Sequence, residues 1–260
     1  MISLESIMGF FPTDMRKPAF GKHLLKEYVE CLALDWIARS TWSAKLTFIG
    51  GTNLRLTKGI DRFSEDLDFD CKDFGEGDFR ALTDGLVSYL VGNGLPAVAK
   101  ERESDKLTAF RRSILFPGLL NDLGLSAFAE ERFLMKVEMQ DQGRAYERAS
   151  AMVKTCGFFF PVGVPPDSVL CAMKLCALLT RAKGRDFYDA MFLLPRTEPD
   201  YGFLSASHPE IVDKASLKKA LRAKAASVDL NLKRRDVEHL LFRHEQAELV
   251  TRFPEFVDSL

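Results

Sequence analysis

The sequence predicts an α+β protein in which a small mixed β-sheet flanked by helices is followed by a helical C-terminal region. Two observations support this prediction. Strand patterns alternate with helical patterns in the first part of the chain, and near Pro161 to Pro166 the pattern changes from strands to helices. Because no low-complexity linker marks the change, we place a soft domain boundary there, with domains at residues 1–163 and 164–260.

The composition is that of an ordinary globular protein. With 260 residues, a formal net charge of -1 and 47% hydrophobic residues, the chain can bury a sizeable core and is not basic overall. No leader-like N-terminus or bilayer-length apolar stretch is found, so we expect a cytoplasmic protein with no membrane partner. The five cysteines form no C-x-x-C pair and the four histidines are scattered, so neither a disulfide framework nor a zinc site is expected.

Helices and strands alternate through the first part of the chain. Apolar side chains recur at helical spacing in the predicted helices and at alternate positions in the strands. Thr52 is placed to cap the start of the second helix, and Gly59 to end it, because glycine readily adopts the left-handed conformation found there. In chain order, the predicted elements are a helix at His23–Arg39, a strand at Lys45–Ile49, a short helix ending at Gly59, a strand at Asp66–Cys71 and a helix at Glu76–Val91.

Three more strands and two more helices are predicted farther along. The strands are Ala97–Glu103, Lys106–Phe116 and Arg132–Gln140. The helices are one capped by Asp167 or Ser168, which contains Lys174, and one at Arg185–Leu194. The last strand carries a further acid, Glu138, on the face opposite its apolar residues Val137 and Met139.

The segment from Phe48 to Asp70 combines a Gly-Gly-Thr turn with two acids. In the strand that follows the turn, Asp66 and Asp68 share a face, so their carboxylates lie about 7 Å apart. Two acids this close favour a cation, and hard oxygen ligands suit Mg²⁺, with Mn²⁺ as the alternative. Gly50 and Gly51 have no Cβ, which lets backbone N–H groups approach phosphate oxygens. The segment therefore predicts a site for a nucleotide triphosphate and its metal.

Other charged residues have both a functional and an ordinary interpretation. Glu138 can be a third acid of the site or an exposed edge residue. Lys174 can project into a phosphate cleft or extend along its helix to solvent. Asp186 and Asp189 can serve the site or stabilise the first turns of their helix. Between residues 214 and 235, eight Lys or Arg stand against one acid; this stretch can contact RNA phosphates, although a charge run on helices is more often a solvated surface.

Taken together, four segments resemble the motif series of the AbiEii/AbiGii-type nucleotidyltransferase toxins, within the polymerase β-like nucleotidyltransferase superfamily. These segments are GGTNLRL, RFSEDLDFD, KVEMQ and CAMKLCALLTRAKGRDFYDAMFLL, and they span roughly residues 45 to 195. The resemblance implies that residues 1–163 form the nucleotidyltransferase core domain. It also implies that residues 164–260 form a helical domain that completes the active-site cleft.

The resemblance implies a role for each matching residue. The implied metal ligands are Asp66, Asp68 and Glu138. The implied catalytic residues are these three acids together with Lys174 and Asp186. The implied nucleotide-binding residues are Gly50, Gly51, Thr52, Arg55, Arg62, Ser64, Lys174 and Arg185.

The implied activity is an NTP-dependent and Mg²⁺-dependent transfer of NMP to an RNA, such as tRNA, or to a protein. The implied biological role is that of the toxin in a toxin–antitoxin system, with a cognate antitoxin as partner. Two other functions remain open on the sequence alone. One is transfer to a small molecule, as in enzymes that modify antibiotics, and the other is a catalytically silent nucleotide-binding module that regulates a partner.

Overall fold

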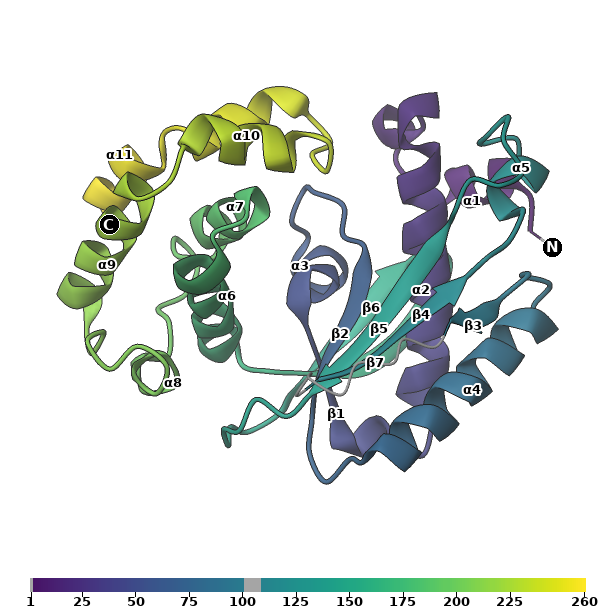
Figure 1. Cartoon of the computed structure of the whole chain (residues 1–260), viewed down its shortest axis with the longest axis horizontal. Helices are drawn as coiled ribbons and strands as arrows, with labels where there is room; N and C mark the ends of the chain where they lie inside the picture. The colour runs from purple at the N-terminus through teal and green to yellow at the C-terminus, as the bar shows by residue number, and fades with distance from the viewer. Residues whose placement is uncertain (1, 101–108) are drawn as a thin grey trace. The chain divides into compact units, whose positions relative to one another are not determined.

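The computed structural model describes residues 2–100 and 109–260, and the chain divides into two compact units. The first, which we call the sheet unit, comprises Met1–Gly59, Phe63–Gly143 and Arg148–Val164. The second, the helical unit, comprises Ile60–Arg62, Arg144–Glu147 and Pro165–Leu260. The elements of both are labelled in Figure 1.

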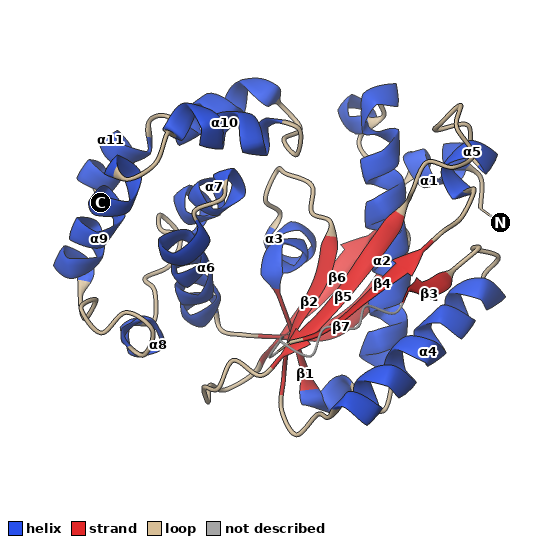
Figure 2. Cartoon of the chain, viewed as in Figure 1, coloured by secondary structure: helices blue, strands red, loops and turns tan. Residues whose placement is uncertain are grey.

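The sheet unit is built on a five-stranded mixed sheet, shown in red in Figure 2. The strand order is β1-β2-β5-β4-β3, with β2 and β5 parallel and the other neighbours antiparallel. The small mixed sheet predicted from the sequence is therefore confirmed. Its strands are β1 (Leu46–Ile49), β2 (Asp66–Cys71), β3 (Val98–Lys100), β4 (Phe110–Leu115) and β5 (Leu134–Gln140). The predicted strands around residues 101–108 extend into a segment that lies outside the described residues.

Burial alternates along the central strands of this sheet. In β5, Met135, Val137 and Met139 are fully buried, whereas Lys136 and Glu138 lie on the more exposed face. The same alternation in β2 buries Leu67 and Phe69 and leaves the two acids on the other face. Because strand side chains alternate between faces, the apolar set forms the core and the charged set is gathered on one surface.

Helices and a hairpin complete the sheet unit. Helices α2 and α4 pack against each other, and α3 packs on β1, β2 and β6. The β6–β7 hairpin was not predicted, because β7 contains Pro161, a residue that usually argues against a strand. The remaining elements of this unit are α1 (Leu4–Gly9), α2 (Gly21–Arg39), α3 (Gly50–Lys58), α4 (Glu76–Gly92), α5 (Leu119–Asp122), β6 (Ala149–Thr155) and β7 (Phe158–Val164).

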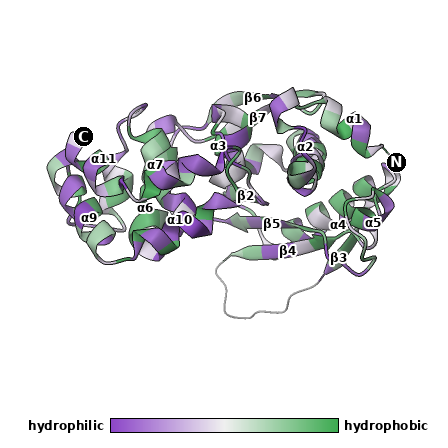
Figure 3. Cartoon of the chain, turned by 90° about the horizontal axis from the view of Figure 1, so that it is seen from above, coloured by the Kyte–Doolittle hydropathy of each residue, from purple (hydrophilic) through white to green (hydrophobic). Residues whose placement is uncertain are grey.

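The helical unit confirms the helical C-terminal region that the sequence predicts. Its helices are α6 (Asp167–Arg181), α7 (Gly184–Leu193), α8 (Tyr201–Ser205), α9 (Lys214–Ala226), α10 (Leu230–Glu238) and α11 (Phe253–Ser259). Helix α7 packs against α6, α10 and α11, and the rings of Phe187 and Phe253 meet edge to face at 4.9 Å. Helix α10 is mostly hydrophilic, as its purple colour in Figure 3 shows.

Two local details of the helical unit differ from the prediction or extend it. The side chains of Asp167 and Ser168 do not cap α6, because the helix begins at Asp167 and Pro166 holds the cap position. A short segment from earlier in the chain, Ile60–Arg62, also belongs to this unit. Arg62 forms an isolated β-bridge with Leu241, which brings its side chain to α7.

Among the described residues, no helix is long and apolar enough to span a membrane.

Candidate active site

The register of three strands gathers the predicted acids on one face of the sheet. Asp68 lies opposite Glu138 on β5, and Asp66 lies opposite Lys136. Neighbouring strands are about 4.8 Å apart, and residues directly opposite each other point to the same side. On β4, Arg111 lies opposite Glu138 and extends the row by one more charged residue. The three acids are therefore neighbours, on the two parallel strands at the centre of the sheet.

Two cations balance these acids. The Arg111 guanidinium donates to both oxygens of Glu138, with Nε–Oε2 at 2.6 Å and Nη2–Oε1 at 2.8 Å. Lys136 Nζ lies 3.6 Å from Asp66 Oδ1. The hydrogen bond to Glu138 raises the pKa of Arg111, so this guanidinium stays charged. Arg111 was not predicted as a site residue, because its position next to Glu138 depends on strand pairing.

Gly50 lies against the carboxylate of Asp68. Its φ is +82°, in the left-handed region, and a Cβ placed on it would be 2.1 Å from Asp68 Oδ2. No side chain fits in that space. Asp68 is brought there by strand pairing, because it lies opposite Ile49, the residue before Gly50. The sequence therefore needs glycine at this position for both conformational and steric reasons.

The start of α3 differs from the prediction. The helix begins at Gly50, so Thr52 lies within its first turn and does not cap it; the cap position belongs to Ile49. The buried Thr52 hydroxyl instead donates to the backbone oxygen of Asp66 at 2.5 Å, which ties α3 to β2. The first N–H groups of a helix have no partner within the helix and favour anions. Gly50, Gly51 and Thr52 provide these groups at α3.

Two other predicted nucleotide ligands of the segment have different surroundings. Arg55 donates to both oxygens of Glu27 on α2, with Nε–Oε2 at 2.8 Å and Nη2–Oε1 at 3.1 Å. Its charge is thereby balanced within the sheet unit. Ser64 is half-buried in the loop that precedes β2.

The sheet acids have the chemistry of a divalent cation site. Asp66 Oδ1 is buried and, among the residues that the structure describes, has no hydrogen-bond partner. This oxygen, the Asp68 carboxylate beside Gly50, and the hard character of carboxylate oxygens all suit Mg²⁺ or Mn²⁺. Within the described ranges, no three His, Cys, Asp or Glu side chains converge as metal ligands. Glu138 is instead directed to Arg111.

In the helical unit, a buried ion cluster joins α6, α7 and the Ile60–Arg62 segment. Arg62 donates to Asp189 through Nε–Oδ1 at 2.6 Å and Nη2–Oδ2 at 2.8 Å. Lys174 Nζ lies 2.9 Å from Asp189 Oδ2. Both cations therefore contact this one carboxylate. Lys174 is only 7% exposed, so it does not extend to solvent as the ordinary interpretation of the sequence proposed.

Burial and charge determine the protonation of this cluster. Burial lowers the pKa of Lys174, although the charge of Asp189 opposes that shift. Burial by itself raises the pKa of Asp189, but the charges of Arg62 and Lys174 outweigh it and lower the value to about 2. With all three groups ionised, two cations share one anion, so the cluster has a net positive charge that favours anions.

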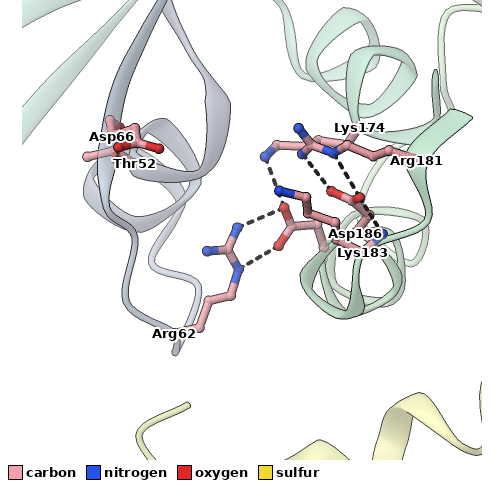
Figure 4. Close-up of polar contacts among 8 residues, drawn as sticks. Thr52, Arg62, Asp66, Lys174, Arg181, Lys183 and Asp186 are labelled. Atoms are coloured by element: carbon pink, nitrogen blue, oxygen red, sulfur yellow. Dashed lines mark hydrogen bonds and ion pairs between the residues drawn. The ribbon is translucent and has the colours of Figure 1, made fainter. Parts of the chain in front are cut away.

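Asp186, the acid predicted to take part in catalysis, holds together the junction between α6 and α7. Its Oδ2 accepts from the backbone N–H of Lys183 at 2.9 Å, and both of its oxygens accept from Arg181, at 2.8 and 3.0 Å. Figure 4 shows these contacts. They agree with the helix-stabilising interpretation of this acid. The acid that contacts Lys174 is Asp189, which was not predicted as a site residue. Arg185 lies half-buried in the first turn of α7.

Comparison with known protein families identifies the family of this chain. The chain matches the family described as "Nucleotidyl transferase AbiEii toxin, Type IV TA system" over residues 32–258. It belongs to this family. The family resemblance drawn from the four sequence motifs is therefore confirmed, and this AbiEii-family chain is a nucleotidyltransferase of toxin type. A search of curated proteins found no match.

Solved structures support the fold of this AbiEii-family protein. It is similar to MenT4, the nucleotidyltransferase toxin Rv2826c from Mycobacterium tuberculosis H37Rv, with a TM-score of 0.59 and 15% identity; 100% of this chain and 91% of that chain are covered. It is also similar to JHP933 from Helicobacter pylori, with a TM-score of 0.53 and 18% identity; 91% and 92% of the two chains are covered. At these identities the likeness shows the fold alone.

Proposed function

We propose that this AbiEii-family protein transfers a nucleotidyl group from an NTP to an acceptor, using a divalent cation held by Asp66 and Asp68 with Glu138 as the third acid. The supporting observation is the strand register that makes these three acids neighbours on one face, next to Gly50. In the reaction, an oxygen of the acceptor attacks the α-phosphorus of the NTP, and pyrophosphate leaves. Catalysis then consists mainly of positioning and charge neutralisation.

The sheet unit supplies most of the groups that this reaction needs. The N–H groups of Gly50, Gly51 and Thr52 at the start of α3 would bind the phosphates. When bound, Mg²⁺, or Mn²⁺ in its place, would neutralise charge on the triphosphate and on the attacking oxygen. Arg55 and Ser64 are proposed as further nucleotide contacts. Arg55 would then have to exchange part of its contact with Glu27 for a phosphate.

The helical unit is proposed to contribute positive charge to nucleotide binding. Lys174 and Arg62 are the cations concerned, and Asp189 holds both of them. Arg185 is proposed as another nucleotide ligand. Asp186 would support the site by fixing the start of α7. Residues 1–163 are proposed as the nucleotidyltransferase core domain and residues 164–260 as the helical domain that contributes these residues apart from Arg62.

RNA, such as tRNA, is the acceptor class that we favour over protein. Four of the eight Lys and Arg residues between 214 and 235 have two kinds of surroundings in the structure. Lys218 and Arg222 contact Asp258, whereas Lys219 and Lys224 line a cavity of about 560 Å³ on α9. Lysines in such a place suit the phosphates of a nucleic acid. A cognate antitoxin is the proposed protein partner, in keeping with the family.

Label transfer tests this function directly. The full chain is incubated with each α-labelled NTP and MgCl₂, in the presence of total tRNA, lysate protein or aminoglycosides. Asp68→Asn should abolish transfer to whichever acceptor takes up label, because the variant loses one carboxylate of the proposed metal site. Glu76→Gln, which removes an exposed acid of α4, is the matched control and should transfer at the wild-type rate. Full transfer by a folded Asp68→Asn variant would refute the proposal.

One observation favours a second candidate, the catalytically silent nucleotide-binding module. The paired guanidinium of Arg111 neutralises Glu138, the third acid. A protein in which this pair persists would bind NTP without turning it over. Equilibrium binding of a labelled NTP with Mg²⁺, followed by recovery of the unchanged nucleotide with every acceptor above, would support the module and exclude the enzyme.

A further inference from the structure

Glu138 is a proposed metal ligand, and in the structure it is bound by the positive side chain of Arg111. Both guanidinium-to-carboxylate bonds are short, and both carboxylate oxygens are used. A carboxylate engaged in this way cannot offer its oxygens to a metal without loosening its hold on the arginine. The other cation on this face, Lys136, lies farther from its acid, with its Nζ 3.6 Å from Asp66 Oδ1.

The exposure of the pair shows that it can be exchanged. The side chains of Arg111 and Glu138 are 44% and 30% exposed. Water and salt screen ion pairs at such exposure, although a guanidinium and a carboxylate joined by two paired hydrogen bonds form one of the stronger surface ion pairs. A divalent ion attracts a carboxylate more strongly than a guanidinium does, since it carries twice the charge at a shorter distance. The contact is thus strong enough to compete with an ion and weak enough to yield to one.

We propose that Arg111 regulates the site by competing with the divalent cation for Glu138, so that it lowers the affinity of the protein for the free ion. This inference rests on the proposed function and adds a residue that none of the sequence motifs contains. When Glu138 turns to the ion, the guanidinium is released next to Asp66 and Asp68, at the face where the triphosphate binds. A guanidinium suits phosphate oxygens, with which it forms paired hydrogen bonds.

The competition therefore couples binding of the divalent ion to binding of the nucleotide. An ion without nucleotide must displace Arg111 without compensation, whereas an ion that arrives with a triphosphate gives the displaced arginine a new partner. Metal and nucleotide should consequently bind better together than separately. This coupling would favour occupation of the site by the ion–nucleotide complex over occupation by the bare ion.

The test measures Mn²⁺ binding to the full chain by electron paramagnetic resonance, without nucleotide. Arg111→Met should bind Mn²⁺ on the order of tenfold more tightly than wild type, because a competing charge is lost. Arg111→Lys should fall between the two, since lysine keeps the charge but not the paired bonds. Arg80→Met is the charge-matched control: Arg80 pairs with Glu76 on α4, and its loss should leave Mn²⁺ affinity unchanged.

A double-mutant cycle separates competition for Glu138 from a general effect of charge. In a Glu138→Gln background the ion no longer gains a carboxylate when Arg111 is removed, so Arg111→Met should tighten Mn²⁺ binding much less. An equal gain in both backgrounds would overturn the inference, as would unchanged or weaker binding in Arg111→Met alone. Neither result would affect the proposed function. If Asp68→Asn binds Mn²⁺ as well as wild type does, the proposed metal site itself fails.

Discussion

The buried Asp189 carboxylate provides the sharpest test of how the helical unit is held together. Asp189→Asn keeps the size of the side chain and removes its charge. Arg62 and Lys174 would then be left as buried cations without their shared anion. Breaking a buried ion cluster by removing one partner typically costs about 3–5 kcal/mol of unfolding free energy. Because Lys174 can lose its proton to relieve part of this cost, we expect a value near the lower end.

Urea unfolding of the full chain, followed by circular dichroism, measures the change. Lys174→Met is the control within the same cluster: it removes one cation but keeps both Arg62–Asp189 bonds, so it should cost clearly less than Asp189→Asn. A loss below about 1 kcal/mol for Asp189→Asn would contradict the assignment, since that is the range of an exposed ion pair.

The pH dependence of the unfolding free energy gives an independent check on the direction of the pKa shift of Asp189. The pKa of Asp189 is lowered from an ordinary value of 3.8 to about 2. An acid whose pKa is lower in the folded state stabilises that state above its unfolded pKa, and this contribution is lost as the pH falls. Wild type should thus lose roughly 2 kcal/mol between about pH 4 and pH 2 through this group. The Asp189→Asn variant should lack that part of the decline.

Three further outcomes follow from the sheet unit and from α9. Gly50→Ala should abolish label transfer and lower the melting temperature, because its Cβ would overlap the carboxylate of Asp68. Burial raises the pKa of Glu30 well above 4.5, so wild type loses stability as the pH rises and the acid ionises more readily in the unfolded chain. Glu30→Gln should therefore raise the unfolding free energy measured by urea titration at pH 8. Lys219→Glu with Lys224→Glu should weaken tRNA binding and reduce its salt dependence, both measured by filter binding.

Each of these outcomes has a matched control. Gly59→Ala imposes a similar left-handed strain, at φ +73°, with no atom in the way, so it should retain label transfer where Gly50→Ala does not. Glu76→Gln, an exposed acid, should not change the pH dependence that Glu30→Gln removes. Reversing the charge of Lys218, which contacts Asp258, should affect tRNA binding less than reversal of the cavity lysines. An equal effect of variant and control would contradict the reasoning in each case.

Local sequence patterns were enough to predict the elements that carry the proposed site. The period of two in β2 and β5 placed Asp66, Asp68 and Glu138 on the polar faces of their strands, and burial in the structure follows that alternation. Gly59 ends α3 in the left-handed conformation, as predicted. These features could be predicted because side-chain periodicity and backbone preference act over a few residues. The motif series is also enough to indicate the family.

The partners of the charged residues were decided by tertiary structure alone. Arg62 and Asp189 are 127 residues apart, and nothing in the local pattern of either segment records their contact. Arg111 reaches Glu138 only because β4 and β5 pair in one register, and a shift by one residue would move it to the other face. Residue type and spacing therefore determined which charges the chain possesses, whereas long-range packing determined which of them neutralise one another.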